Sequence, residues 1–381
     1  MNPDACSSSA SSVVSGHASE ISFSNATLKE QQQHIVNLLK GQTYTIPYLC
    51  KCLPGWYLGV NPNYERVRDE QDAFVDEYSS PKANSSVILD ADPEKEGLRE
   101  MAKKVNLSHC IACLFPKASA EKFQVLFEKM AWFFAFDDDA DNFLKADEFA
   151  NQHVIEFLKY WMDLNRTGPE PVVYQSCHIY RSCGPKLAMG FSETAKEQFL
   201  ETTIEYVNCL LSVSKKRETY LPPVEEYIEE RIVNIGVYPT MDLIPFVSGL
   251  EISREIMQHK AMRTIRYHIV RIVTLTNDLF SVKKEIKDGQ YDNIVPLLMT
   301  CKGMTLQEAV DYTVELVEES YHAVDDSEKQ LPALEGKEKE DLAEYVEQLR
   351  WQATGSVLWH ELSERYLKRD AFDETKITVH L

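Results

Sequence analysis

The pattern of apolar and polar residues predicts helices along almost the whole chain from residue 65 onward. Apolar residues recur at steps of three and four, which is the spacing of a helix with one buried face. One such stretch, residues 200–211, follows Ser192 as its expected N-terminal cap. Another follows Thr305 and Glu308, whose spacing is that of a capping box. These features favour an all-α protein.

The first 64 residues are less regular than the rest. Residues 1–24 are rich in Ser and poor in apolar side chains, so burial cannot offset the entropy lost on ordering them. We therefore expect a disordered tail there. Residues 25–64 are expected to form a segment that packs on the domain, with a short helix at 29–40 that ends at Gly41.

The remaining chain is expected to form one domain. Helical patterns run from about residue 65 to 370, and residues 371–381 are expected to be a C-terminal tail. Only Val172 to Tyr174 looks like a strand, and it is too short to count as one. No repeat of 20–50 residues is visible, which argues against a solenoid.

The apolar face of one predicted helix runs directly into a cluster of carboxylates. Apolar residues keep the helical spacing from Phe123 to Phe134, and the same face continues to Asp137, Asp138 and Asp141. Carboxylates on a buried face must be paired or bind cations, because an isolated buried charge is too costly. Mg²⁺ held by carboxylates and by substrate phosphate oxygens would meet this requirement.

Two other interpretations of this acidic cluster stay open. The cluster could end a helix in solvent, as many groups of charged residues do. It could also be a calcium loop, with Asp137, Asp139 and Asp141 at positions 1, 3 and 5 and Glu148 at position 12. Against the calcium loop, Asn142 occupies the position that is normally glycine, and no partner loop follows.

A second set of oxygen-bearing side chains lies on one face of another predicted helix. Asn277, Ser281 and Glu285 are four residues apart and continue the apolar face of residues 265–273. The helix is expected to end at 288–289. An amide, a hydroxyl and a carboxylate one turn apart offer three oxygens to a hard cation. The alternative is a helix whose polar end falls in register by chance.

The amino-acid composition argues against nucleic-acid-binding and membrane-bound classes of protein. The 40 basic and 60 acidic side chains give a formal charge of −20, which argues against binding to nucleic acid or to an anionic membrane. No stretch approaches 18 uninterrupted apolar residues, and the N-terminus lacks the features of a signal peptide. We expect a cytoplasmic protein with no stable membrane insertion.

The number and spacing of the cysteines indicate that they are reduced thiols in the cytosol. Nine cysteines form an odd set without the spacing of a disulfide scaffold. Cys110 and Cys113 form a Cys-x-x-Cys pair, but Cys50 and Cys52 are a poor second half of a four-ligand zinc site. A structural zinc ion is therefore not expected.

Together, the two oxygen-rich clusters resemble the signature motifs of class I terpene synthases. The first reads Asp-Asp-x-x-Asp at 137–141, and 140 residues later the second reads Asn-Asp-x-x-Ser-x-x-x-Glu at 277–285. Arg365 and Tyr366 resemble the terminal Arg-Tyr pair of that family, and Arg231 lies where the family has its diphosphate-sensing arginine. The likeness is to the short, single-domain form of microbial, and in particular fungal, enzymes.

This resemblance implies a helical bundle around a central active-site cavity, which binds a prenyl diphosphate and three Mg²⁺ ions, with Mn²⁺ as an expected substitute. The metal ligands that it implies are Asp137, Asp138 and Asp141 in the first cluster and Asn277, Ser281 and Glu285 in the second. The residues that it implies for diphosphate binding are Arg231, Lys284, Arg365 and Tyr366. The aromatic faces expected to line the pocket, where they would stabilise a carbocation, are Phe133, Phe134 and Trp359.

The expected reaction is the cyclisation of farnesyl diphosphate to a sesquiterpene hydrocarbon or alcohol, with release of diphosphate. A diterpene cyclase acting on geranylgeranyl diphosphate is an alternative. A chain-elongating prenyl diphosphate synthase fits less well, because it has two Asp-rich motifs, and a calcium-sensing module would explain the first cluster alone. The position of an effector carbonyl stays open between Ile235 and Gly236, as do the role of Asp139 and the choice between monomer and homodimer.

Overall fold

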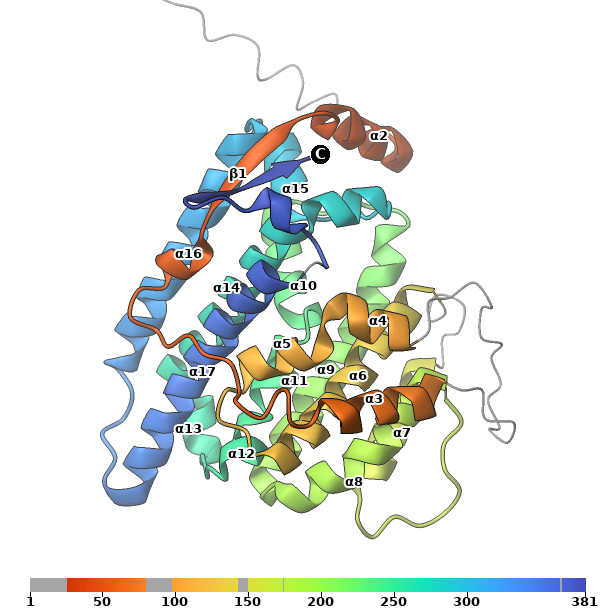
Figure 1. Ribbon diagram of the computed structural model, residues 1–381, viewed down its shortest axis with the longest axis vertical. Helices are drawn as coiled ribbons and strands as arrows, with labels where there is room; N and C mark the ends of the chain where they lie inside the picture. Colours follow the sequence, from red (N-terminus) through yellow and green to blue (C-terminus); the bar gives the residue numbers. More distant parts are fainter. Residues whose placement is uncertain (1–25, 80–97, 143–149, 174, 364) are drawn as a thin grey trace, which may run out of the picture.

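The computed structural model describes residues 26–79, 98–142, 150–173, 175–363 and 365–381. The regular secondary structure of this part of the chain is almost entirely helical, which confirms the all-α prediction (Figure 1). Residues 1–24, which we predicted to be disordered, lie outside the described residues.

Long helices joined by short segments make up the described chain. Up to residue 190 the elements are α2 (Leu28–Leu39), β1 (Thr43–Pro47), η1 (Leu49–Cys52), α3 (Arg68–Ser79), α4 (Leu98–Val105), α5 (Leu107–Leu114), α6 (Ala120–Asn142), α7 (Ala150–Met162), η3 (Gln175–Ile179) and α8 (Tyr180–Gly190). They are followed by α9 (Glu193–Arg217), α10 (Val224–Asn234), α11 (Val237–Met241), α12 (Ile244–Ser248), α13 (Arg254–Gln258), α14 (Lys260–Lys287), α15 (Ile294–Lys302), α16 (Leu306–Glu328), α17 (Gly336–Leu362), η4 (Arg369–Ala371) and β2 (Lys376–His380).

Several predicted helix ends are confirmed. The Ser192 side chain accepts a hydrogen bond from the backbone of Ala195 at the start of α9. Thr305 and Glu308 form both hydrogen bonds of a capping box at the start of α16. Helix α14 ends at Lys287, as its pattern predicted. Local sequence therefore sets these boundaries through caps that satisfy the first and last backbone groups.

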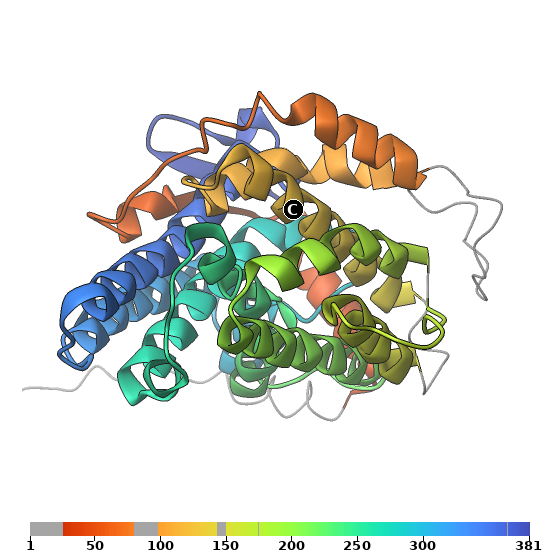
Figure 2. The same ribbon diagram turned by 90° about the horizontal axis from the view of Figure 1, so that it is seen from below.

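Helix α14 is at the centre of the bundle. It packs against α16, α17, α10 and α15, while α6 packs against α5, α8 and α9. Figures 1 and 2 show α14, α16 and α17 running side by side. Helix α17 also lies against α5, and a Cβ at Gly355 would stand 2.3 Å from the carbonyl oxygen of Cys113. Glycine is therefore needed at this position for the two helices to approach so closely.

A small antiparallel sheet joins the two ends of the described chain. Strand β1 pairs with β2, with Thr43 opposite His380. Residues 371–381, which we expected to be a C-terminal tail, contain β2, and residues 172–173, which we judged too short to count as a strand, are irregular. Tyr44 in β1 is buried, and its hydroxyl donates to the backbone oxygen of Leu279 in α14 at 2.9 Å. The N-terminal segment is thus fixed to the helix that carries the second cluster.

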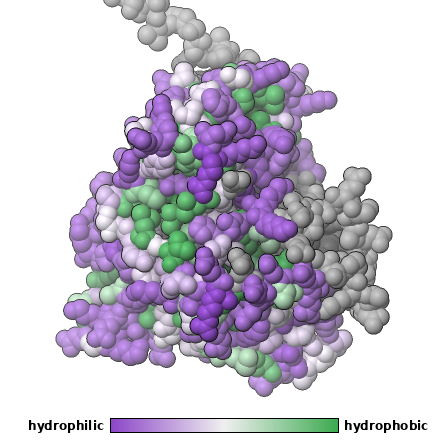
Figure 3. Space-filling view, in the orientation of Figure 1, coloured by the Kyte–Doolittle hydropathy of each residue, from purple (hydrophilic) through white to green (hydrophobic). Residues whose placement is uncertain are grey.

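Most of the face seen in Figure 3 is hydrophilic, and a hydrophobic area interrupts it. Between η1 and α3, the side chains of Tyr57, Leu58 and Val60 are 40–49% exposed. In the part of the chain that the structure describes, no helix has the length and apolar character needed to cross a membrane.

Candidate active site

A cavity of about 440 Å³ opens among α6, α10, α14 and α17. This volume is within the range of about 300–1,000 Å³ that is usual for small-molecule sites. Ten of the residues that the sequence assigned to the site line this cavity: Phe133, Phe134, Asp137, Arg231, Asn277, Lys284, Glu285, Trp359, Arg365 and Tyr366.

The first acidic cluster lies at the end of α6. Asp137 is half-buried and accepts a hydrogen bond of 3.0 Å from the hydroxyl of Tyr206. Asp138 and Asp141 continue the same helix, but their side chains, like that of Asp139, lie outside what the structure describes. Because residues 137–142 are helical, they do not form the sharply turned first half of a calcium loop.

The second cluster lies on α14, and the structure divides its three members. Asn277 and Glu285 line the cavity, whereas Ser281 is only 1% exposed. The Ser281 hydroxyl donates to the backbone oxygen of Asp278 at 3.4 Å. The helical spacing therefore places all three residues on one side of α14, but Ser281 lies deeper than its two neighbours.

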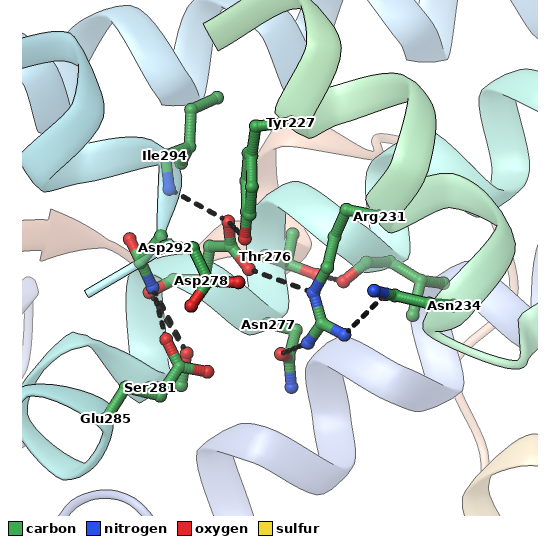
Figure 4. A network of polar contacts seen from close by, with 12 residues as sticks. Tyr227, Arg231, Asn234, Thr276, Asn277, Asp278, Ser281, Glu285, Asp292 and Ile294 are labelled. Atoms are coloured by element: carbon green, nitrogen blue, oxygen red, sulfur yellow. Dashed lines mark hydrogen bonds and ion pairs between the residues drawn. The ribbon is translucent and has the colours of Figure 1, made fainter. Parts of the chain in front are cut away.

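Hydrogen bonds connect four of the predicted residues across three segments. Arg231 donates from Nη2 to Asn277 Oδ1 at 3.1 Å, and from Nη1 to Asn234 Oδ1 at 3.0 Å (Figure 4). Asn277 Nδ2 lies 3.2 Å from the Tyr366 hydroxyl, and Arg365 Nε donates to the same hydroxyl at 3.0 Å. The arginine of α10 and the Arg-Tyr pair after α17 thus meet at Asn277.

His360 is a residue of the site that the sequence did not reveal. It is 1% exposed, and burial lowers its pKa to about 4, so the ring is neutral at pH 7. Its Nδ1 donates to the Ser356 carbonyl at 2.6 Å, because a carbonyl only accepts. Its Nε2 must then accept from Asn277 Nδ2 at 3.0 Å, which turns Asn277 Oδ1 toward Arg231. A lone histidine without a motif gave no signal of this role.

Asp278, the second residue of the Asn-Asp motif, forms an ion pair with Arg231 on the side away from the cavity. Its carboxylate accepts from the Tyr227 hydroxyl at 2.6 Å and from the Ile294 backbone at 3.1 Å, and its Oδ1 lies 3.8 Å from Arg231 Nε (Figure 4). The side chain is fully buried, and burial raises the pKa of Asp278 above its ordinary value although Arg231 opposes this shift. Asp278 therefore connects α10 and α15 to α14, the helix that carries the second cluster, rather than facing the cavity.

The three predicted aromatic residues form part of the cavity wall, but in different ways. Phe133 stacks on Tyr206 with 4.8 Å between the two ring centres, and Lys129 Nζ lies 4.7 Å from the centre of the Phe133 ring. Phe134 is half-buried and lies 6.3 Å from Trp359, measured between ring centres. Phe134 is thus the most exposed of the three rings, while Phe133 is largely covered by its neighbours.

Helix α10 ends at a break beside this wall. Gly236 has a φ of +71°, and a Cβ there would lie 2.0 Å from the ring of Phe133. The Gly236 carbonyl accepts from the Thr240 hydroxyl at 2.9 Å. The carbonyl of Ile235 lacks the usual donor four residues later, because Pro239 has no N–H. Both Ile235 and Gly236 line the cavity.

The donor chemistry of the cavity suits a hard cation. Asp137, Asn277 and Glu285 contribute carboxylate and amide oxygens, which Mg²⁺ prefers over the nitrogen and sulfur ligands of zinc. Within the described residues, no three His, Cys, Asp or Glu side chains are grouped closely enough to hold a metal. This finding agrees with a second cluster made partly of Asn and Ser, and with a first cluster of which only Asp137 has a described side chain.

Comparisons with known proteins identify the family. Residues 129–323 match the family model described as terpene synthase family 2, C-terminal metal binding, and this range includes both clusters. The chain is 25% identical to the terpene cyclase braA of Annulohypoxylon truncatum, over 89% of this chain and 90% of the relative. It is also 25% identical to the sesquiterpene cyclase hepA of Aspergillus oryzae, over 90% and 95% of the two chains.

Solved structures agree on the fold. An α-eudesmol synthase superposes with a TM-score of 0.68 at 19% identity, over 80% of this chain and 97% of the other. A linalool/nerolidol synthase from Streptomyces clavuligerus superposes with a TM-score of 0.66 at 19% identity, over 81% and 98%. With the matched motifs and the cavity between them, these findings show that the chain belongs to the terpene synthase family and is a class I terpene synthase, a lyase.

Proposed function

We propose that this enzyme uses Mg²⁺ to ionise farnesyl diphosphate and cyclises the resulting cation to a sesquiterpene hydrocarbon or alcohol. The observation that carries the proposal is one cavity that combines oxygen ligands, basic side chains and an aromatic wall. Relatives named as sesquiterpene cyclases or synthases favour the fifteen-carbon substrate over the ten- and twenty-carbon ones.

Asp137 on α6 and Asn277 and Glu285 on α14 would hold the metal ions from opposite sides of the cavity, with Asp138, Asp141 and Ser281 completing the two clusters. The bound cations would neutralise the diphosphate as its bond to carbon breaks. Their charge would also offset the acidic character of a chain whose formal charge is −20.

The basic side chains would bind the diphosphate oxygens directly. Arg231 already points its guanidinium at Asn277 Oδ1, and a phosphate oxygen placed there would accept the same N–H. Lys284 forms an ion pair of 2.9 Å with Asp288, so binding of diphosphate would exchange one anionic partner for another. Arg365 and Tyr366 would approach from the segment after α17.

We infer that Ile235, rather than Gly236, supplies the effector carbonyl. The Gly236 oxygen is engaged by Thr240, whereas Pro239 denies the Ile235 oxygen its helical donor. A carbonyl dipole directed at the substrate would favour positive charge as the leaving group departs. The wall of Phe134 and Trp359 would then keep the cation folded and away from water.

The eight cysteines within the described residues are all free thiols, which supports our proposal of a cytoplasmic enzyme. We further propose that the enzyme acts as a monomer or homodimer.

Incubation with the ten-, fifteen- and twenty-carbon diphosphates, followed by mass spectrometry of the extracted products, tests the proposal. We expect cyclic fifteen-carbon products with Mg²⁺ and none with EDTA. Asp137→Asn and Glu285→Gln should each abolish turnover while the helical circular dichroism stays close to that of the parent, because the amides keep the shape but lose the anionic ligand.

Full turnover in EDTA would contradict the metal requirement, and cyclic products from only the twenty-carbon substrate would contradict the chain length. A chain-elongating enzyme would instead consume isopentenyl diphosphate, and adding it to the assay distinguishes this alternative.

A further inference from the structure

Asn293 is a fully buried polar residue that touches the second cluster without belonging to it. It follows the turn after α14 and is the N-terminal cap of α15. Its Nδ2 lies 2.8 Å from Glu285 Oε2, 3.4 Å from the Ser281 hydroxyl and 3.0 Å from the backbone oxygen of Asp278. One side chain thus contacts two of the three residues proposed to bind metal on α14.

The orientation of this amide follows from its other contact. The backbone N–H of Val295 donates to Asn293 Oδ1 at 3.0 Å, and an N–H cannot donate to an NH₂ group. The NH₂ group must therefore face α14, where its hydrogens meet three acceptors. The amide oxygen of Asn293 therefore caps α15, and its nitrogen donates hydrogen bonds to acceptors on α14.

Two neighbouring contacts hold Asn293 in place. The backbone N–H of Ile294 donates to Asp278 at 3.1 Å (Figure 4), and Asp292 pairs with Arg217 of α9 at 2.6 Å. The turn between α14 and α15 is therefore fixed on both sides of Asn293. A neutral donor in this position can orient the Glu285 carboxylate without placing a positive charge beside a cation site.

We propose that Asn293 is a positioning residue for the second metal cluster: it orients Glu285 and Ser281 and binds neither metal nor substrate. This inference rests on the proposed Mg²⁺-dependent function. A partner that orients a metal ligand commonly changes metal affinity by about 10- to 100-fold when it is removed.

The test separates the two tasks of the side chain. Asn293→Ser keeps an oxygen that can cap α15 but removes the amide donor. Asn293→Asp keeps the shape and the cap but places a carboxylate against Glu285. Thr305→Ala is the matched control, because it removes the cap of α16, which has no contact with Glu285 in the described structure.

Calorimetric titration of Mg²⁺ in the presence of inorganic pyrophosphate measures affinity without turnover, and thermal unfolding without ligands measures stability. We expect Asn293→Ser to unfold close to the parent temperature and to bind Mg²⁺ about 10- to 100-fold more weakly. Asn293→Asp should also bind Mg²⁺ more weakly, because it removes the same donor. Thr305→Ala should lower the unfolding temperature and keep the parent affinity.

Parent-like Mg²⁺ affinity in Asn293→Ser would overturn the inference. So would a failure of both Asn293 variants to fold, since the residue would then serve the fold alone. A parent protein that binds Mg²⁺ and pyrophosphate but makes no product from farnesyl diphosphate would contradict the proposed substrate and leave the role of Asn293 supported by its own titration.

Discussion

The amine of Lys129 on α6 is buried in the core, next to the Phe133 ring of the aromatic wall. Its side chain is fully buried, with Nζ 4.7 Å from the centre of the Phe133 ring, and burial lowers its pKa from 10.5 to about 7. Below pH 7 the amine is protonated in both the folded and the unfolded chain, so the full cost of burying the charge is present. Between pH 7 and 10.5 only the unfolded chain keeps the proton, and this cost falls as the pH rises.

Lys129→Met should therefore stabilise the protein, and more at low pH than at high pH. The gain in the free energy of unfolding is expected to be on the order of 3–5 kcal/mol at pH 6.5 and to shrink by pH 9.5. Urea denaturation at the two pH values measures it. Lys329→Met, at a side chain that is 72% exposed, is the control and should change little. An equal gain from Lys129→Met at both pH values would show that packing, and not charge, sets the effect.

The polar residues around the cavity show which positions and contacts of single residues the sequence could predict. The steps of four between Asn277, Ser281 and Glu285 predicted a shared side of α14, which the structure has. The sequence did not predict that Ser281 lies deeper, because depth depends on the turn that follows α14. His360 and Asn293 were missed because their contacts join segments, and a pattern along one helix carries no information on its neighbours.

At the scale of elements, the break between α10 and α11 shapes the cavity wall. Gly236→Ala would put a side chain in the left-handed region, at a cost of about 1–2 kcal/mol, and would push against the buried ring of Phe133, at about 1–3 kcal/mol more. Gly303→Ala has the same backbone strain at φ +70° but nothing within 4 Å of the new Cβ.

We therefore expect Gly303→Ala to lower the free energy of unfolding by about 1–2 kcal/mol and to keep activity. Gly236→Ala should lower it further and reduce turnover at least tenfold, because Phe133 and the Ile235 carbonyl both shift. Thermal unfolding and product assays on both variants measure the difference. If the two variants behaved alike, contact with Phe133 would have no part in the effect.

Helices and strands differed in how well their sequence patterns predicted them. A helix forms its hydrogen bonds within about four residues, so periodicity and caps were enough to predict α9, α14 and α16. The pairing of β1 with β2 joins residues as far apart in the chain as Thr43 and His380, and the only nearby pairing of β2 in the described chain is a single bridge between Phe372 and Ile377. Such pairing depends on the whole fold.

At the scale of the whole molecule, Arg365 and Tyr366 connect the chain after α17 to α14. Arg365 lies over the Phe134 ring, 5.5 Å from its centre, and donates to Tyr366, which contacts Asn277. If Arg365 also binds the diphosphate, it helps to close the cavity against water. Lysine would replace it poorly, because a point charge cannot span two phosphate oxygens.

Arg365→Lys should lose about 2–4 kcal/mol of transition-state stabilisation, which is roughly 30- to 1000-fold in turnover. Looser closure should also admit water and shift products toward acyclic alcohols such as farnesol and nerolidol. Turnover and product distribution, measured together, test this expectation. Parent-like values for both would place Arg365 outside the active site, as for a surface arginine.

The sheet between β1 and β2 also sets an order of events during synthesis. Thr43 is made 337 residues before His380, which at about 5–20 residues per second is an interval of roughly 20–70 s. Helices α6 and α14 are made within that interval, and the segment from Arg365 to β2 follows both of them. A chain still on the ribosome can thus make both helices that carry the two clusters well before β2 is available to pair with β1.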